Sequence, residues 1–204
     1  MHKEILTKEQ SDLLPFVRAF NKDFRLVGGT AIALHIGHRR SIDFDLFSDK
    51  PFKNSDIRRK ISQSMPIEHL IVNHTGELTF LIKGVKFTFY QYRFILEYGE
   101  KFDDVIAMPD LLTLAAMKAH ALGGRAKWKD YVDLYFIMTR FYNLAQIVEK
   151  ANGLFKDDFN EKLFRTQLGY FDDVNYAEKV EYLPGFEVSD DIIKEKLVEF
   201  SVDN

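Results

Sequence analysis

The chain has 204 residues, of which 46% are hydrophobic, so it is long enough to bury the core of a single enzyme-sized domain. It contains no cysteine, which excludes disulfides, thiolate catalysis and a zinc site built on thiolates. No apolar run approaches the about 18 residues of a membrane-spanning helix, and the N-terminal residues lack the apolar core of a secretory signal. We therefore expect a soluble cytoplasmic protein with no membrane partner.

The net charge of −3 is unevenly distributed along the chain. Residues 156–204 carry 6 basic and 13 acidic side chains, which leaves 22 basic and 18 acidic ones for residues 1–155. A mildly basic N-terminal part suits an anionic substrate. The excess is too small for duplex DNA, which requires a strongly basic face, so no duplex DNA partner is expected.

The first predicted elements are a helix and a strand. Thr7 and Gln10 have the spacing of a capping box, which opens a helix whose apolar face continues to Phe20. Residues 24–27 predict a short strand. The helix is expected to cover the sheet to which this strand belongs.

Two glycines follow that strand directly. Gly28 and Gly29 would let backbone N–H groups approach phosphate oxygens, and a short helix predicted over residues 30–36 follows and ends at Gly37. The N-terminus of this helix adds a partial positive charge, with Thr30 near its start. By itself, a Gly-Gly after a strand is usually only a tight turn.

A strand predicted over residues 42–47 makes the Gly28-Gly29 motif more specific. Because side chains alternate along a strand, Asp43 and Asp45 should share one face, while the apolar residues, Ile42 among them, should point to the other. Two adjacent carboxylates repel unless a cation or a proton lies between them, and such oxygen ligands suit Mg²⁺ or Mn²⁺ with substrate phosphates. The order and spacing indicate metal-dependent nucleotidyl transfer; the alternative is a turn followed by a polar strand edge.

The remaining pattern is first mixed and then helical. A polar helix is predicted over residues 55–64, and strands over residues 68–72, 78–82 and 85–92, the last two joined by a hairpin turn at Lys83-Gly84. From Pro109 onward helices predominate, with later ones over residues 144–152, 158–168 and 190–200. The expected units are a core of residues 1–108 and a helical region of residues 109–204, joined in one compact body.

One lysine lies in an apolar stripe of the first C-terminal helix. Lys118 shares a face with leucines and an alanine, so it must either snorkel outward or meet an anion. The next helix begins within residues 125–135 and carries Asp130 and Asp133 one turn apart; Asp133 could simply pair within its own helix. Trp128 in the same segment could stack on a base, although a lone helical aromatic more often belongs to the core.

Together these motifs resemble a known family. The stretches 28–31 and 37–47, and Lys118 with residues 125–134, look like the nucleotidyltransferase family that includes the AbiEii-like toxins of type IV toxin–antitoxin and abortive-infection systems. The resemblance covers roughly residues 24–140. It implies an α+β fold: a DNA-polymerase-β-like nucleotidyltransferase core, in which helices flank a mixed β-sheet, followed by a helical C-terminal region.

The resemblance also implies roles for individual residues. The metal ligands for Mg²⁺ (or Mn²⁺) would be Asp43 and Asp45, and the catalytic residues would be these two with Lys118 and Asp130. The nucleotide phosphates would be bound by Gly28, Gly29, Thr30 and Lys118. Beside the resemblance, Arg39 or Arg40 could join Lys118 in stabilising the triphosphate. If Lys118 binds phosphate, Lys118→Met should weaken nucleotide binding without loss of thermal stability.

One position departs from the family pattern. A third carboxylate is commonly supplied from a strand beside the Asp-x-Asp strand, and the expected position holds Thr88 here. A hydroxyl is a poorer ligand and base than a carboxylate. Either Asp130 or another acid such as Glu77 takes over part of the role, or the site mainly binds nucleotide. If Thr88 fills the vacancy, it should face Asp43 and Asp45.

Two functional hypotheses follow. The first is an enzyme that moves an NMP from an NTP to a hydroxyl of an acceptor, which could be tRNA or another RNA, a protein or a small molecule. In a toxin–antitoxin setting it would also have a cognate antitoxin as partner. The second is a degenerate nucleotidyltransferase that binds nucleotide and acts as an interaction module. The residue pattern records neither the acceptor nor toxicity.

Overall fold

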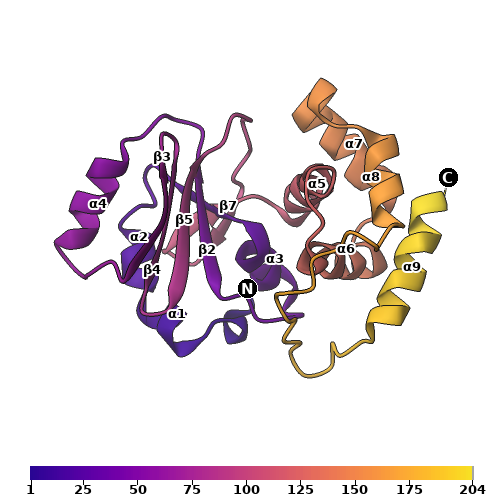
Figure 1. Ribbon diagram of the computed structural model, residues 1–204, viewed down its shortest axis with the longest axis horizontal. Helices are drawn as coiled ribbons and strands as arrows, with labels where there is room; N and C mark the ends of the chain where they lie inside the picture. Colours follow the sequence, from indigo (N-terminus) through magenta and orange to yellow (C-terminus); the bar gives the residue numbers. More distant parts are fainter. Residues whose placement is uncertain (204) are drawn as a thin grey trace.

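The computed structural model describes residues 1–203 and contains a five-stranded mixed sheet beside a group of helices (Figure 1). β2 pairs in parallel with β5, and the other neighbours are antiparallel. In sheet order the strands are β1 (Arg25–Val27), β2 (Asp43–Ser48), β5 (Val85–Gln91), β4 (Glu77–Ile82) and β3 (His69–His74). The predicted α+β class and mixed sheet are confirmed.

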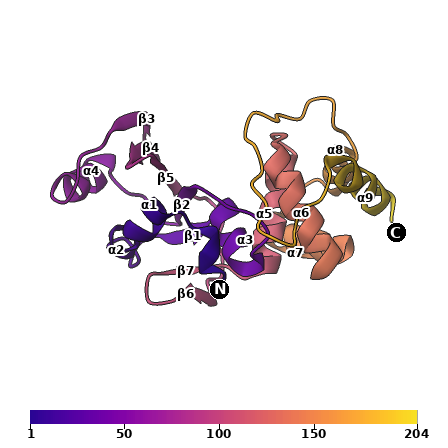
Figure 2. The ribbon, with the colours of Figure 1, turned by 90° about the horizontal axis from the view of Figure 1, so that it is seen from below.

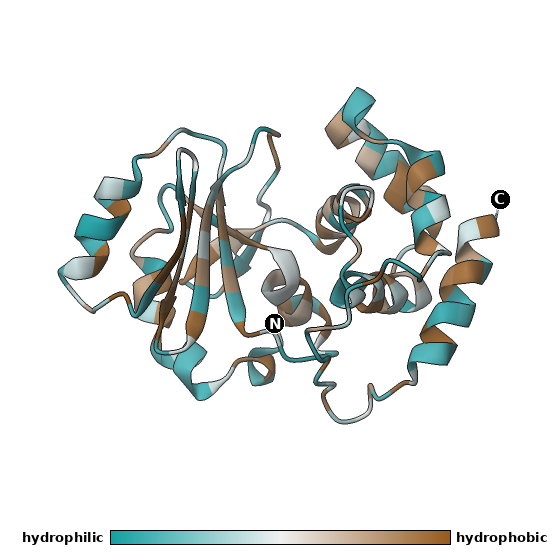
Figure 3. Cartoon of the chain, viewed as in Figure 1, coloured by the Kyte–Doolittle hydropathy of each residue, from teal (hydrophilic) through white to brown (hydrophobic). Residues whose placement is uncertain are grey.

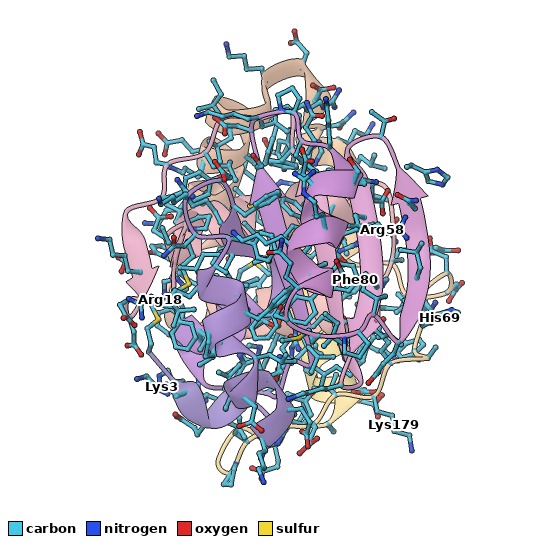
Figure 4. All side chains as sticks on the ribbon, turned by 90° about the vertical axis from the view of Figure 1, so that its left-hand side faces the viewer. Lys3, Arg18, Arg58, His69, Phe80 and Lys179 are labelled. Atoms are coloured by element: carbon cyan, nitrogen blue, oxygen red, sulfur yellow. The ribbon has the colours of Figure 1, made fainter. Side chains whose placement is uncertain are left out.

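One face of the sheet packs against the N-terminal helices through aromatic side chains. The ring of Phe16 lies 5.1 Å from that of Phe87, and Phe20 lies 4.8 Å from Phe89, measured between centroids. Figure 4 labels Phe80 and Arg58 on this side of the molecule; Phe80 is fully buried, and Arg58 lies on α4 (Asn54–Ser62). Since alternate residues of β2 and β5 are buried here, the other face of these strands is left for a site.

The N-terminal helix differs from the prediction. The capping box of Thr7 and Gln10 is present, but the helix is divided at Leu13 into α1 (Lys8–Asp12) and α2 (Leu14–Arg18). Pro15 lies in the first turn of α2, and because proline has no backbone N–H it cannot continue the hydrogen-bond ladder of α1. A short 3-10 helix, η1 (Lys3–Ile5), precedes both.

A small second sheet, β6 (Glu100–Phe102) and β7 (Ile106–Met108), was not predicted. Each strand has only three residues, too few for an alternating pattern to be visible in the sequence. In the main sheet, β4 is coloured largely brown, whereas brown and teal alternate along β5 (Figure 3).

The helix α3 (Gly28–Ile36) lies between the sheet and the C-terminal helices (Figure 2). It begins at Gly28, two residues before the predicted start, and ends at Gly37, whose φ of +78° a glycine adopts without strain. The C-terminal helices are α5 (Leu111–Leu122), α6 (Trp128–Arg140), α7 (Leu144–Phe155), the 3-10 helix η2 (Lys156–Asp158), α8 (Glu161–Leu168) and α9 (Asp190–Val202).

One hydrophobic core cluster includes residues of the sheet, α3 and the C-terminal helices. The predicted division of the chain into units of residues 1–108 and 109–204 therefore stays a prediction. In the part of the chain that the structure covers, no helix has the length and apolar character of a membrane span.

Residues 169–189, here called the return segment, lead from α8 back to the sheet side before α9 begins (Figure 1). The backbone N–H of Arg40 donates to the Glu181 carbonyl at 2.8 Å, and that of Leu183 donates to the His38 carbonyl at 3.0 Å. The loop after α3 is thereby fixed to a segment distant in sequence.

Candidate active site

A cavity of about 610 Å³ lies between the free face of the sheet, the start of α3 and the helices α5 and α6. Most of the predicted site residues line it: Gly28, Gly29, Arg39, Asp43, Asp45, Glu77, Thr88, Lys118 and Asp130. Two other hollows, of about 780 and 670 Å³, lie on the surface over α8 with α9 and over α4. Neither hollow contains a predicted site residue, so the cavity beside the sheet is the candidate active site.

The two carboxylates of β2 share the cavity face, as the alternation predicts. Asp43 and Asp45 line the cavity while Phe44 is fully buried on the opposite face. The prediction for Ile42 is wrong: Ile42 precedes β2, is 51% exposed and also lines the cavity. Alternation does not extend to Ile42 because the strand begins only at Asp43.

Gly28 makes room for one of these carboxylates. Its φ is +72°, a left-handed conformation that residues with a Cβ rarely adopt. A Cβ at Gly28 would overlap Asp45 Oδ2, and a Cβ at Gly29 would lie 2.8 Å from Arg39 Nη2. The glycine pair therefore permits both the backbone turn and the close approach of Asp45 and Arg39.

Thr30 holds the start of β2 and is not among the residues that line the cavity. Its buried hydroxyl is hydrogen-bonded to Ser41 Oγ at 2.9 Å and to the backbone carbonyl of Asp43. These contacts occupy the hydroxyl. The predicted phosphate contact of Thr30 therefore has no support in this geometry, in which its hydroxyl is bound to the backbone of Asp43.

The neighbouring strand β5 places a lysine beside the carboxylates. In the parallel register Asp43 pairs with Lys86, and Lys86 Nζ lies 2.5 Å from Asp43 Oδ2. Although partial burial opposes its charge, Asp43 and Asp45 raise the pKa of Lys86. Burial, and next the charge of Asp43, raise the pKa of Asp45. Asp43 and Asp45 thus already have a cationic partner, the ammonium group of Lys86, which was not predicted from the sequence.

Thr88 pairs with Asp45 in the same register and lines the cavity, so it faces the carboxylates as expected. Glu77 also lines the cavity, on β4, opposite Tyr90. Within residues 1–203 no three Asp, Glu or His side chains are grouped so that they could hold a metal ion together. Asp43 and Asp45 are neighbouring carboxylates on the cavity face of β2.

Lys118 lies in a buried ion network, where snorkelling is excluded because the residue is only 7% exposed. Its Nζ contacts Asp130 Oδ1 and lies 3.1 Å from Asp133 Oδ2. Arg39 holds Asp133 with two hydrogen bonds of 2.8 Å, and His38 Nε2 lies 2.8 Å from the same carboxylate. Although burial opposes ionisation, Arg39 and Lys118 keep the pKa of Asp133 well below its usual range.

The two arginines of the loop after α3 have different positions. Arg39 lines the cavity, but its guanidinium is committed largely to Asp133. Arg40 lies outside the cavity lining, where its Nε donates to Glu181 Oε1 at 2.7 Å. The predicted nucleotide contact of Arg40 is therefore unsupported, because its side chain fixes the return segment.

Further basic side chains at the cavity were not predicted. Lys127 and Lys129 each lie 3.2 Å from a carboxylate oxygen of Glu178. Although partial burial opposes ionisation of Glu178, the two lysines lower its pKa to about 2. All three residues line the cavity. Glu178 belongs to the return segment, so no local sequence pattern signals the cluster.

Trp128 belongs to the core. It is 4% exposed, and its indole N–H donates to Asp190 Oδ1 at 3.1 Å. Since the ring also packs near Tyr131, stacking of Trp128 on a nucleobase is excluded in this arrangement.

Fold and cavity together define a nucleotidyltransferase scaffold, and the chain belongs to the AbiEii family. The profile of this family, described as the nucleotidyl transferase AbiEii toxin of type IV toxin–antitoxin systems, matches residues 16–70 and 90–181. These ranges include the Gly-Gly turn, the β2 carboxylates and the buried ion network. Lys86 and Thr88 lie in the stretch between the matched ranges.

Similar proteins extend over nearly the whole chain. The uncharacterized protein aq_aa25 of Aquifex aeolicus (strain VF5) is 33% identical over 203 residues, which cover 96% of this chain and 97% of the relative. MenT4, a nucleotidyltransferase toxin from Mycobacterium tuberculosis H37Rv, has a TM-score of 0.62 at 10% identity, covering 95% of this chain and 81% of its own. JHP933 from Helicobacter pylori has a TM-score of 0.52 at 16% identity, and the match covers 97% of this chain and 90% of JHP933. These two structures are similar in fold.

Proposed function

We propose that this protein is a metal-dependent nucleotidyltransferase that moves an NMP from an NTP to an acceptor hydroxyl. The observation that carries the proposal is the placement of Asp43 and Asp45 on one cavity face, directly beside the Gly28-Gly29 start of α3. Family membership supports the same reaction class. The acceptor classes are tRNA or other RNA, protein and small molecules, and an antitoxin is the partner that the toxin family suggests.

The cavity residues fit a divalent cation. Burial, and next the charge of Asp43, raise the pKa of Asp45, and a divalent cation between the two carboxylates would relieve their repulsion. Asp43 and Asp45 would hold Mg²⁺ or Mn²⁺, with Lys86 displaced from Asp43 or sharing it. Bound there, the metal would polarise the phosphates and offset negative charge that develops in the transition state.

The chain itself would bind and orient both substrates. Backbone N–H groups at Gly28 and Gly29 and the N-terminus of α3 would hold phosphate oxygens, with Lys118 adding positive charge. The acceptor oxygen forms a bond to the α-phosphorus as the bond to pyrophosphate breaks. Asp130, whose Oδ2 lies 3.3 Å from Arg125 Nε and accepts no hydrogen bond from residues 1–203, would take the hydroxyl proton. We propose the cytoplasm as the location, because NTPs and RNA are present there.

A nucleotide-binding module without transfer activity is the second candidate. It is favoured by Thr88, which is a weak ligand beside Asp45, and by the Lys86–Asp43 pair, which competes with a metal. Under this proposal the protein would bind NTP and act through its antitoxin or another partner.

A transfer assay separates the two. The purified protein is incubated with each α-labelled NTP, Mg²⁺ or Mn²⁺, and total RNA, lysate protein or small metabolites as acceptor pools. The enzyme proposal predicts label transfer to one pool, lost in Asp43→Asn/Asp45→Asn. Tight NTP binding without transfer to any pool would support the binding module instead.

A further inference from the structure

The cavity face of the sheet changes character along the strand direction. Three pairs of residues that lie opposite each other on β2 and β5 line the cavity. Along the strands, the charged pair Asp43–Lys86 comes first, then Asp45–Thr88, and then the aromatic pair Phe47–Tyr90. The aromatic pair lies two residues beyond Asp45, which corresponds to roughly 7 Å of extended strand. A ligand with phosphates at the carboxylates would thus have its next group over the aromatic rings.

Three rings form this aromatic end. The centroid of Phe47 lies 5.1 Å from that of Tyr90 and 5.1 Å from that of Tyr92, and the Tyr90 and Tyr92 centroids are 6.4 Å apart. All three residues line the cavity, and Tyr90 is 37% exposed. A ligand in the cavity can therefore reach these three rings. The aromatic residues on the other side of the sheet are, in contrast, fully buried.

We propose that Phe47, Tyr90 and Tyr92 form a nucleobase-stacking subsite. A base has an apolar π-face that stacks on aromatic side chains with little regard to its identity, and an apolar wall next to charged residues suits a ligand that joins phosphates to a ring. The subsite rests on the proposed function. The base belongs either to the NTP or to the terminal nucleotide of a nucleic-acid acceptor, and the shared chemistry is stacking of a base on these rings.

The test measures binding by variants that lose a ring but keep an apolar side chain. Tyr90→Leu and Phe47→Leu are compared with Tyr170→Leu, which removes a tyrosine that is 46% exposed outside the cavity. Calorimetry with Mg²⁺ follows three probes: an NTP, inorganic tripolyphosphate and a short single-stranded oligoribonucleotide of mixed sequence.

If the NTP base stacks here, both cavity variants bind NTP about tenfold more weakly and tripolyphosphate as the wild type does. If the acceptor base stacks here, oligoribonucleotide binding weakens instead. Wild-type affinity of both variants for NTP and oligoribonucleotide would overturn the subsite, as would the same loss in Tyr170→Leu. Tripolyphosphate binding that requires Asp43 and Asp45 would uphold the proposed function even then, so the two failures are distinguishable.

Discussion

Gly28 matters to the site both through its backbone conformation and through its lack of a side chain. Its positive φ starts α3 immediately after β1, and the absence of a Cβ leaves the space that Asp45 Oδ2 occupies. The Gly-Gly pair was visible in the sequence, but its steric relation to Asp45 was not, because it depends on the pairing of β1 with β2.

Gly28→Ala should cost more stability than the same change at Gly84. Both glycines have a φ near +70°, but among the described residues no heavy atom lies within 4 Å of a Cβ built on Gly84. Gly84→Ala should therefore show only backbone strain, about 1–2 kcal/mol. Gly28→Ala should lose more in denaturant unfolding and should also bind Mn²⁺ more weakly, because Asp45 must move. Equal losses in the two variants would contradict this account.

Lys118 shows how burial changes an expectation drawn from sequence. Read as a phosphate ligand alone, Lys118 should be replaceable by methionine without loss of stability. In the structure its ammonium is buried between Asp130 and Asp133, so removing it leaves two buried carboxylates with fewer cationic partners.

Lys118→Met should therefore lower the free energy of unfolding by about 3–5 kcal/mol, the usual cost of breaking a buried ion pair. Lys162→Met, at an exposed position of α8, is the matched control and should change stability by no more than about 0.5 kcal/mol. Chemical denaturation measures both. A Lys118→Met protein as stable as the control would show that the network contributes nothing.

At the scale of elements, the sequence predicted β2 and β5 well, because one face of each strand is buried and the alternation is regular. The register between them could not be derived from the alternation alone, since it is set by contacts between residues far apart in sequence; only the family resemblance pointed to Thr88. That register places Lys86 beside Asp43 and Thr88 beside Asp45. The contacts of the return segment, such as Glu178 with Lys127 and Lys129, were missed for the same reason.

The register makes Thr88→Asp an informative change. A third carboxylate beside Asp45 should lower the stability of the metal-free protein, because it joins two anions that already repel. Mg²⁺ should restore that loss by binding the folded state, and any transfer rate should rise. Thermal unfolding with and without Mg²⁺ tests this, with Thr88→Val as the uncharged control. If Mg²⁺ has the same small effect on both variants, Thr88 is not the vacant position.

For the whole molecule, stability should fall in mildly acidic solution. Burial lowers the pKa of His35, His38 and His120 below the ordinary histidine value of 6.5. The folded state then binds fewer protons than the unfolded state, so the free energy of unfolding is lost as pH falls below about 6.5. The low pKa of Asp133 acts in the same direction at lower pH, where its stabilisation disappears as the pH falls through the folded value.

Thermal unfolding measured from pH 7.5 to 5 should show this decline. His35→Gln should make the decline shallower, because one group that takes up a proton on unfolding is gone. His74→Gln, at an exposed position on β3, serves as control and should keep the wild-type profile. A stability that is constant over this range would contradict the prediction.

The central claim is that Asp43 and Asp45 bind a divalent cation together with an NTP, and calorimetric titration of NTP with and without Mg²⁺ tests it most directly. The wild-type protein should bind NTP more tightly with Mg²⁺, and Asp43→Asn/Asp45→Asn should lose that gain. The control Asp12→Asn/Asp49→Asn removes two exposed carboxylates outside the cavity and should keep it. Metal-dependent NTP affinity that is unchanged in Asp43→Asn/Asp45→Asn would contradict the account.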